Sequence, residues 1–309
     1  MARKLTTAFS VAVLLALAGC TAKAPSEIDW EAFNGRKAYQ HVERIVGYGP
    51  RPSASPSLIH SSTYIGTQLQ EYGLDVEEQV FVAPTPRGPT QFRNIIGKTR
   101  VRHGSTGRVI VIGSHYDTKY MPDKQFVGAN DGGSSCGVLL EMARVASGVA
   151  DLWFVFFDGE ECVKDYGVND GLWGSTYFVQ DLKGNKRLDR VRAMILLDMV
   201  GDKDLNIVMP ANSHRGLVQR VFDAAKATGN RDRFSFGEMA TLDDHVPFLT
   251  AGIPAVDIID FQFGSAPGLN DYWHTEKDTL DKISPRSLEI IGQTTLRLVD
   301  SLRKNPKLD

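Results

Sequence analysis

A short apolar run that ends in two adjacent glutamates constrains this chain more than any other feature. Residues 152–157 are apolar throughout, and only Asp158 and Gly159 separate them from Glu160 and Glu161. A run of this length bounded by polar residues predicts a strand that is buried on both faces of a sheet. In open α/β folds, ligands bind at the carboxyl ends of such strands. Because two neighbouring carboxylates in a semi-buried site repel each other, one of them needs a cation or a proton.

Strand-like and helix-like segments alternate along the rest of the chain. Strands are predicted at 76–82, 92–96, 108–113, 152–157, 192–197, 205–209 and 254–259. Helices are predicted at 30–46 with Asp29 as N-cap, and at 57–72, 132–149, 175–182, 213–228, 247–250 and 285–303. Prolines and glycines predict a loop at 84–89, and 230–243 is expected to be a long loop. The alternation predicts an α/β fold in which a mixed, largely parallel central sheet has helices on both faces. We expect one catalytic domain over residues 29–309.

The N-terminal residues have the organisation of an export signal. Two basic residues precede a mostly apolar stretch at 9–18, which is too short to span a bilayer, since that takes ~20 residues. Small residues then precede Cys20, in a pattern that resembles the lipobox of bacterial lipoproteins. We therefore expect a signal peptide over 1–19, a lipidated Cys20 and a tether over 20–28. The protein would be an exported bacterial lipoprotein on the periplasmic or cell-surface face of a membrane, which it contacts through Cys20 only.

The charge balance argues against one class of partner. The 35 Lys and Arg residues nearly match the 37 Asp and Glu residues, and the formal net charge is -2. Nucleic-acid binding leaves a basic stripe or patch in a sequence. We therefore expect no nucleic-acid partner.

Acidic residues and histidines recur at or after the ends of the predicted strands. The candidates are His115, Asp117, Asp131, Glu160, Glu161, Asp198 and His274. A catalytic zinc ion is held by histidine nitrogen and carboxylate oxygen, with one position left for water or substrate. Asp131, Glu161 and His274 supply three such ligands. Glu160, next to one of them, is placed to accept a proton.

Two interpretations of the remaining candidates stay open. His115 and Asp198 could hold a second metal with Asp131 as a bridge, or they could orient the first site. Each candidate also has an ordinary explanation when taken alone: 158–161 could be a solvated acidic turn, and Asp131 could be a helix N-cap. The joint pattern favours a metal site.

The order of these residues resembles that of the M28-type zinc exopeptidases and of their relatives, the animal-type glutaminyl cyclases, over most of residues 38–300. The segments that carry the resemblance are 113–120, 126–131, 156–161, Asp243-Asp244-His245-Val246-Pro247-Phe248 and Tyr272-Trp273-His274-Thr275. About a dozen residues separate Glu161 from Gly174-Ser175, as in the cyclases, whereas aminopeptidases usually join these motifs closely. The run 252–260 looks most like bacterial members of the cyclase branch.

The resemblance implies a specific reaction and specific roles. The reaction is the zinc-dependent cyclisation of N-terminal glutamine to pyroglutamate with release of ammonia, an acyl transfer on peptides or proteins that begin with glutamine. One zinc ion per chain is implied. The implied roles are zinc ligation by Asp131, Glu161 and His274, acid–base catalysis by Glu160, a hydrogen-bonded acidic network around Glu160 formed by Asp198 and Asp243, and a glutamine pocket lined by Trp273.

The chain departs from the cyclase pattern at two positions. Animal cyclases pair a cysteine in the position of Ser114 with one that matches Cys136, so that disulfide cannot form here. A pocket tryptophan has no obvious match, and Tyr166 is the nearest aromatic residue. Whether Cys136 pairs with Cys162 stays open, although export would permit it.

Two other functions remain alternatives. The first is a two-zinc aminopeptidase, in which His115 and Asp198 hold the second ion. The second is a non-catalytic binding module on the same fold, which predicts that ligands are missing, and none is.

Overall fold

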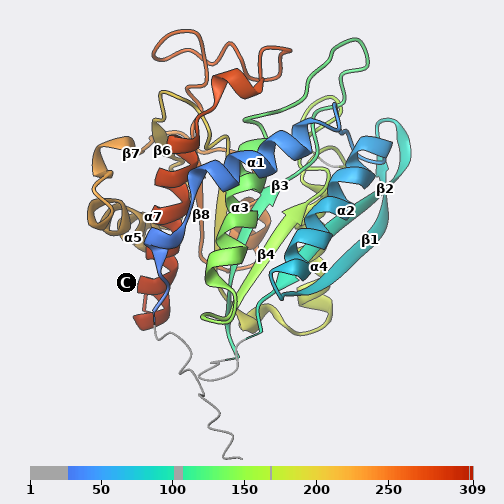
Figure 1. Cartoon of the computed structure of the whole chain (residues 1–309). Helices are drawn as coiled ribbons and strands as arrows, with labels where there is room; N and C mark the ends of the chain where they lie inside the picture. Colours follow the sequence, from blue (N-terminus) through green and yellow to red (C-terminus); the bar gives the residue numbers. More distant parts are fainter. Residues whose placement is uncertain (1–26, 101–106, 168, 306, 309) are drawn as a thin grey trace, which may run out of the picture.

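The computed structural model describes residues 27–100, 107–167, 169–305 and 307–308 (Figure 1). The predicted signal peptide, Cys20 and most of the tether lie outside these residues. At the end of the tether, Ile28 is buried in the main core, and its amide donates a hydrogen bond to Asp300. No helix in the described part of the chain has the length and apolar character that crossing a bilayer requires.

In the described residues, six strands form the central sheet, in the order β1-β2-β4-β3-β5-β8. These strands are β1 (Asp75–Thr85), β2 (Gly88–Lys98), β3 (Val109–His115), β4 (Leu152–Phe157), β5 (Val191–Asp198) and β8 (Ala255–Ile259). The four strands β4, β3, β5 and β8 run parallel to one another, whereas β2 is antiparallel to both β1 and β4. The prediction of a mixed, largely parallel sheet is confirmed.

Helices cover both faces of this sheet. They are α1 (Gly35–Val46), α2 (Pro56–Glu71), α3 (Gly133–Ala146), α4 (Trp173–Gly184), α5 (Arg215–Ala227), α6 (Val246–Thr250) and α7 (Pro285–Lys304). Side chains alternate along a strand, so Phe154 and Phe156 belong to the hydrophobic cluster that includes α1, α2, α3, α5 and α7, whereas Val155 and Phe157 belong to the cluster that includes α4 and α6. Figure 1 shows α1, α2, α3 and α7 on one side of the sheet. Burying a side chain of this size contributes about 1.5–3 kcal/mol, and β4 is buried on both faces as predicted.

A small second sheet lies beside the central one. In it, β6 (Ile207–Met209) pairs in parallel with β7 (Phe234–Phe236). Short 3₁₀ turns occur at η1 (Trp30–Ala32), η2 (Leu188–Arg190), η3 (Arg231–Arg233) and η4 (Leu280–Lys282). The prediction of a continuous loop at 230–243 is therefore wrong over its first half, where η3 and β7 form.

Two other local predictions are corrected. The first long helix begins at Gly35 rather than at residue 30, because the side chain of Asn34 caps it by accepting from the amides of Arg36 and Lys37. Asp29 makes no side-chain cap. The predicted loop at 84–89 contracts to a tight turn, since the hairpin pairs residues as far as Thr85 and Gly88. The prolines within these strands are tolerated because only residues 95–98 of β2 also pair with β4.

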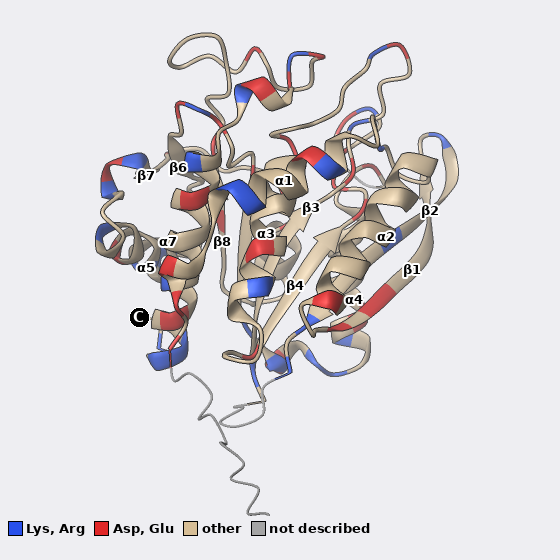
Figure 2. Cartoon of the chain, in the orientation of Figure 1, with Lys and Arg blue, Asp and Glu red and all other residues tan. Residues whose placement is uncertain are grey.

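Acidic and basic side chains alternate on the helices of the visible face. Figure 2 shows both signs of charge on α1, α3 and α7. On α3, for example, Arg144 forms an ion pair with Glu141 at 2.6 Å. Charge is therefore mixed rather than segregated on these helices.

Candidate active site

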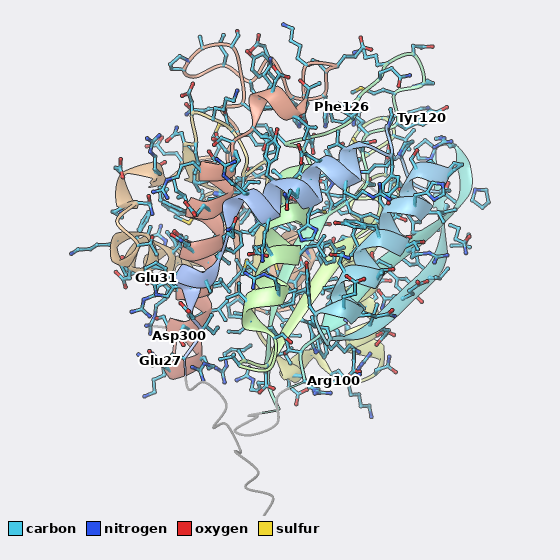
Figure 3. The ribbon with its side chains drawn as sticks, in the orientation of Figure 1. Glu27, Glu31, Arg100, Tyr120, Phe126 and Asp300 are labelled. Carbon is cyan, nitrogen blue, oxygen red and sulfur yellow. The ribbon has the colours of Figure 1, made fainter. Side chains whose placement is uncertain are left out.

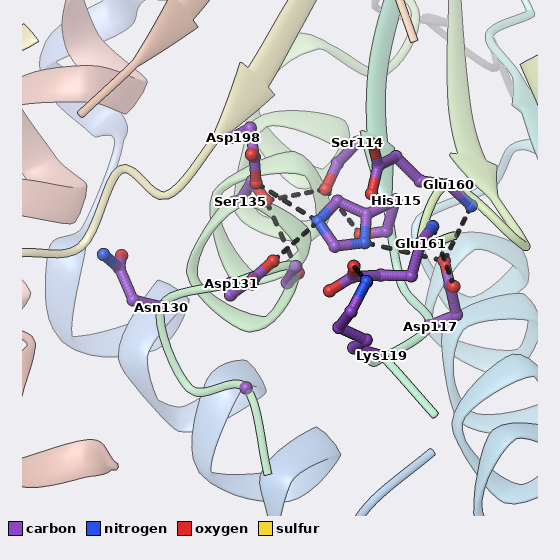
Figure 4. Close-up of polar contacts among 12 residues, drawn as sticks. Ser114, His115, Asp117, Lys119, Asn130, Asp131, Ser135, Glu160, Glu161 and Asp198 are labelled. Carbon is purple, nitrogen blue, oxygen red and sulfur yellow. Dashed lines mark hydrogen bonds and ion pairs between the residues drawn. The ribbon is translucent and has the colours of Figure 1, made fainter. Parts of the chain in front are cut away.

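The carboxyl ends of the parallel strands carry the candidate residues to one end of the molecule. β3 ends at His115, β5 ends at Asp198, and β4 runs directly into Glu160 and Glu161. Figure 4 shows these side chains converging with Asp131. In Figure 3 this end of the molecule carries Tyr120 and Phe126, and Arg100 marks the opposite end. The sheet thus gathers acids from segments that are far apart in the sequence.

Asp131, Glu161 and His274 form a compact group. One ligand atom from each lies within 4.8 Å of the other two. Nε2 of His274 is 3.0 Å from Oε1 of Glu161 and 3.3 Å from Oδ2 of Asp131. Both carboxylates are buried. The structure therefore brings together the three residues that the sequence proposed as zinc ligands.

Backbone contacts fix the two acidic members of this group. Gly159 has φ +74°, and a Cβ there would collide with the ring of Phe92, so the sharp turn after β4 requires glycine. The carboxylate of Asp117 then accepts hydrogen bonds from the amides of Glu160 (3.2 Å) and Glu161 (3.4 Å). This turn directs both glutamates into the site.

Asp131 and His274 are held by neighbouring side chains. Asp278 is fully buried and accepts from the amides of Asn130 (2.7 Å) and Asp131 (3.0 Å). His274 has φ +53°, which is uncommon for a residue with a Cβ. Its ring stacks on Trp273 with centroids 3.9 Å apart and meets the edge of Phe126. The surrounding packing therefore holds a strained backbone at this histidine.

A second group shares Asp131 with the first. Nε2 of His115 lies 3.1 Å from Oδ1 of Asp131 and 3.2 Å from Oδ1 of Asp198. These three side chains are also close enough to one another to hold a metal ion. Asp131 thus directs one oxygen toward each histidine. The geometry is compatible with a second metal held by His115 and Asp198, and also with these two residues orienting the first site.

The site contains more buried acid than its histidines can balance. Burial raises the pKa of Glu160 well above its usual range, and the charges of Asp243 and Glu161 raise it further while His115 opposes them. Burial alone would lower the pKa of His274, but the adjacent carboxylates of Asp131 and Glu161 raise it to about 9. An uncompensated group of this kind favours the binding of a cation.

The unpaired atoms fit a zinc ion. Oδ2 of Asp131 and Oε2 of Glu161 are buried and accept no well-formed hydrogen bond from the described residues; the cationic atoms beside them are Nε2 of His274 at 3.3 Å and Nζ of Lys119 at 3.7 Å. Buried polar atoms without partners are costly, so they indicate a missing ligand. Two carboxylates and one imidazole nitrogen are a donor set typical of catalytic zinc. The residues present therefore fit the metal.

Glu160 itself has a partner that the sequence did not identify. The hydroxyl of Tyr166 donates to its carboxylate, at 2.8 Å from Oε1. Tyr166 lies in the irregular segment after β4, where no periodicity predicts the direction of a side chain. The only indication in the sequence was that Tyr166 is the aromatic residue nearest to the position at which the cyclases have a pocket tryptophan.

Asp198, Asp243 and Trp273 line the same cavity as Glu160, which has a volume of about 540 Å³. The contacts of the two aspartates differ from the network implied by the resemblance. Asp198 pairs with His115, and Asp243 accepts from the amide of Asp244. Both acids therefore belong to the cavity, while the hydrogen bond to Glu160 comes from Tyr166.

The two cysteines of the fold do not pair with each other. Cys136 donates to the carbonyl of His115 and lies 3.7 Å from the hydroxyl of Ser114, the residue that replaces the expected cysteine. The Nζ of Lys119 lies 3.1 Å from Sγ of Cys162. Both thiols are free.

Comparison with known proteins identifies the family to which this chain belongs. The model of peptidase family M28 matches residues 94–299. A glutaminyl-peptide cyclotransferase from Drosophila melanogaster is 28% identical over 273 residues, which cover 78% of this chain and 72% of that protein. The crystal structure of an Acidobacteriales bacterium glutaminyl cyclase matches with a TM-score of 0.83 and 35% identity, over 91% of this chain and 99% of that one. A leucine aminopeptidase precursor from Bacteroides thetaiotaomicron matches with a TM-score of 0.75 and 26% identity, over 90% and 98%.

The chain therefore belongs to peptidase family M28, where it is homologous to the glutaminyl-peptide cyclotransferases. The fold and the enzyme class expected from the sequence are confirmed. The roles of individual residues in this chain do not follow from the comparison, and they rest on the geometry described above.

Proposed function

We propose that this protein is a zinc-dependent glutaminyl-peptide cyclotransferase, which converts N-terminal glutamine to pyroglutamate and releases ammonia. One observation carries the proposal. Asp131, Glu161 and His274 converge within 4.8 Å, and the carboxylate of Glu160 stays outside that group on the wall of the same cavity. The homology to cyclotransferases supports the choice of reaction.

Asp131, Glu161 and His274 would hold one zinc ion per chain. When bound, zinc polarises the γ-carbonyl of the substrate glutamine. The aromatic wall formed by Trp273 would keep the glutamine side chain folded back toward its own α-amine. Because attack is intramolecular, this positioning removes much of the entropic cost of the reaction.

Glu160 would transfer a proton from the attacking α-amine to the leaving amide nitrogen. The α-amine nitrogen forms a bond to the γ-carboxamide carbon, and Glu160 accepts the proton that this nitrogen loses. The bond from the same carbon to the amide nitrogen then breaks, and Glu160 returns the proton to that nitrogen, which leaves as ammonia. Positioned acid–base groups of this kind contribute roughly 10²–10⁴-fold in rate. The hydroxyl of Tyr166 holds the carboxylate in place.

A two-zinc aminopeptidase is the second candidate function. Its support is the intact group of His115, Asp131 and Asp198, together with the structural match to an aminopeptidase precursor. The Acidobacteriales cyclase structure argues against it, because it matches with higher identity and TM-score than the aminopeptidase precursor does.

One assay separates the two functions. The purified protein is incubated with a Gln-initiated peptide and with a matched Leu-initiated peptide, and its zinc content is measured. Cyclisation is expected to release ammonia from the first peptide only, with one zinc ion per chain. Free leucine from the second peptide, with two zinc ions per chain, would support the aminopeptidase.

We also propose that the protein is exported and anchored through a lipidated Cys20, with residues 29–309 as the catalytic domain. The lipobox-like sequence before Cys20 supports the anchor. Labelling with a radioactive fatty acid in a bacterial host tests it. The label should be present in the wild type and in Cys162→Ser, and absent from Cys20→Ser; label retained in Cys20→Ser would contradict the anchor.

A further inference from the structure

The end of the molecule opposite the active site gathers basic side chains from segments that are far apart in the sequence. Residues 98–100 lie at the end of β2, residues 107–108 precede β3, and residues 183–192 lead from the end of α4 into β5. Because β3 and β5 are parallel and carry active-site residues at their carboxyl ends, the segments that precede them lie at the other end of the sheet. Figure 2 shows basic residues at this lower end of the molecule.

Direct contacts join the three segments into one surface. Nε of Arg190 donates to the carbonyl of Gly107 at 3.4 Å. Nε of Arg108 donates in turn to the carbonyl of the residue that precedes Arg190, at 3.0 Å. The charged groups of Lys98 and Arg190 lie 5.2 and 5.8 Å from the centre of the same Trp153 ring. The basic residues of these segments, which we call the basic face, are therefore neighbours in space.

This basic face has a positive formal charge in a chain that is negative as a whole. Its segments contain eight Lys and Arg residues and one acidic residue, Asp189. Asp75, Glu77 and Asp181 form ion pairs with members of the face. Asp151 lies close enough to act on it electrostatically. With these five acids included, the formal charge of the face is +3, whereas the whole chain carries -2.

Helix dipoles account for only part of this charge. Lys183 lies in the last turn of α4, where a cation is favourable. Arg100 and Arg108 instead lie beside strands, Arg190 lies in the 3₁₀ turn η2, and all three are exposed. Burial and then the charge of Arg108 lower the pKa of Arg192, so cations of the face repel one another. An anionic partner would relieve this repulsion.

The chain enters the fold beside the basic face. The amide of Ile28 donates to Asp300 near the end of α7. Nη1 of Arg192 donates to the carbonyl of Leu302 in the same part of that helix, at 3.2 Å. Figure 3 shows Glu27 at this end of the molecule. The N-terminal tether therefore begins next to the face and on the side away from the active site.

The length of the tether limits the partner. The chain from Cys20 to Glu27 spans at most about 25 Å when it is fully extended. A lipid on Cys20 would thus keep the basic face close to a bilayer. A negatively charged membrane surface attracts such a face by roughly fivefold in affinity for each Lys or Arg near it.

We propose that the basic face docks on the anionic phospholipid head groups of the membrane that holds Cys20, and that the active site is thereby directed away from the bilayer, toward soluble peptides. The inference rests on the proposed lipid anchor and goes beyond the proposed reaction. Cys20 would then not be the only contact with the membrane. A nucleic acid is the other polyanion that a basic face can bind, but the tether favours the bilayer because it holds the face near it.

Two exposed lysines of the face, Lys183 and Lys186, can report whether it is covered. The full-length lipidated protein is reconstituted into vesicles of phosphatidylcholine alone or with phosphatidylglycerol, and it is acetylated with a reagent that does not cross membranes. Mass spectrometry then gives the rate at each lysine. Both lysines should react roughly tenfold more slowly on the anionic vesicles. Lys203, exposed at the active-site end, is the internal reference and should react equally on both.

Two double variants test whether charge causes the protection. Arg100→Glu with Arg190→Glu changes the charge of the face from +3 to -1 and should abolish the protection. Cooperative unfolding in urea would show that this variant is folded. Lys124→Glu with Lys277→Glu is the matched control, because it reverses two exposed charges at the active-site end, and it should keep the protection. Salt at ~1 M, where the Debye length is about 3 Å, should abolish the protection in the wild type.

The outcomes separate the basic face from the lipid anchor. Flotation with both kinds of vesicle but equal lysine rates, or protection that persists in the Arg100 and Arg190 variant, would overturn the docking and leave the anchor intact. Flotation with anionic vesicles only, with the lysines protected, would support the docking and overturn the anchor. Flotation with neither would overturn both. Protection by double-stranded DNA but not by anionic vesicles would overturn membrane docking and assign the face to nucleic acid.

Discussion

Two histidines, the buried His41 and the partly buried His274, show how the same residue type serves a structural role in one region and a chemical role in another. In the helical layer, His41 lies between the hydroxyls of Tyr64 (2.6 Å) and Tyr72 (3.1 Å). At the end of the sheet, His274 lies between the carboxylates of Asp131 and Glu161. Burial lowers the pKa of His41 to about 4, whereas the carboxylates raise that of His274 to about 9.

The pKa values of the two histidines differ because their hydrogen-bonding partners differ, rather than because of their burial. Neutral hydroxyls satisfy both nitrogens of His41 without charge, so this cluster of His41, Tyr64 and Tyr72 is complete without a ligand. The active site instead collects more carboxylates than the neighbouring cationic groups His115, His274 and Lys119 can balance. Among the described residues, the buried atoms of this site that lack a hydrogen-bond partner include Nδ1 of His115, Oδ2 of Asp131 and Oε2 of Glu161. Complete polar satisfaction thus marks a structural histidine, and an acidic surplus marks a site that needs a cation.

The largest expected effect is that of replacing Glu160, the carboxylate that does not ligate zinc. Glu160→Gln should lower kcat by roughly 10²–10⁴-fold, because the amide cannot accept the proton of the attacking amine. Zinc content should stay at the wild-type level, since Glu160 is not among the three converging ligands. The exposed Glu78→Gln serves as control and should keep full activity. Near-normal turnover in Glu160→Gln would remove this residue from the mechanism.

Removal of zinc should destabilise the folded protein as a whole. A chelator is expected to lower the free energy of unfolding of the wild type by about 3–4 kcal/mol at zinc concentrations far above its dissociation constant, because the folded state alone binds the ion tightly. Urea denaturation with and without chelator measures the difference. In Asp131→Asn the chelator should change the free energy of unfolding much less. An equal change in both proteins would contradict ligation by Asp131.

Tyr166→Phe should have an intermediate effect on catalysis. Loss of the hydrogen bond to the Glu160 carboxylate should lower kcat/KM about tenfold, since a hydrogen bond to a charged group contributes about 1.5–3 kcal/mol. The zinc content should not change. Tyr177→Phe is the matched control, because that ring stacks on Phe81 outside the cavity. Equal kcat/KM values for the two variants would show that Tyr166 does not position Glu160.

The smallest expected effect is on the free energy of unfolding at acid pH, and it tests the cluster of His41, Tyr64 and Tyr72. The folded pKa of His41, about 4, is below the unfolded value of about 6.5. Its contribution to stability is therefore complete above pH ~6.5 and is lost as the pH falls toward about 4, by at most about 1.4 kcal/mol per pH unit. Urea denaturation at several pH values should give a smaller loss in His41→Gln than in the wild type. Identical slopes would show that His41 is not held neutral.

The sequence predicted the parts of the site that regular strands position. The end of β4 at Glu160 and Glu161 followed from an apolar run of strand length, and the structure confirms that strand. Asp131 and His274 were proposed as ligands from their residue types and their places after predicted strands, and the resemblance in residue order supported them, because no local pattern brings distant loops together. Asn34, rather than Asp29, caps the first long helix because a 3₁₀ turn intervenes, and periodicity alone does not detect such a break.

The parts that the sequence did not predict depend on tertiary contacts in irregular segments. Tyr166 reaches Glu160 from a stretch without periodicity. The cavity-lining residues Met239 and Thr241 are placed by hydrogen bonds to Ala211 and Asn212, more than twenty residues earlier in the chain. Side-chain direction in such segments is fixed by the folded neighbours, which no local sequence pattern describes.

Zinc-edge anomalous diffraction from crystals of the purified protein would test the ion-binding claim directly. It should show one anomalous peak per chain, bounded by the carboxylates of Asp131 and Glu161 and by Nε2 of His274. A second peak of similar height between His115 and Asp198, or a single peak away from these three side chains, would contradict the account.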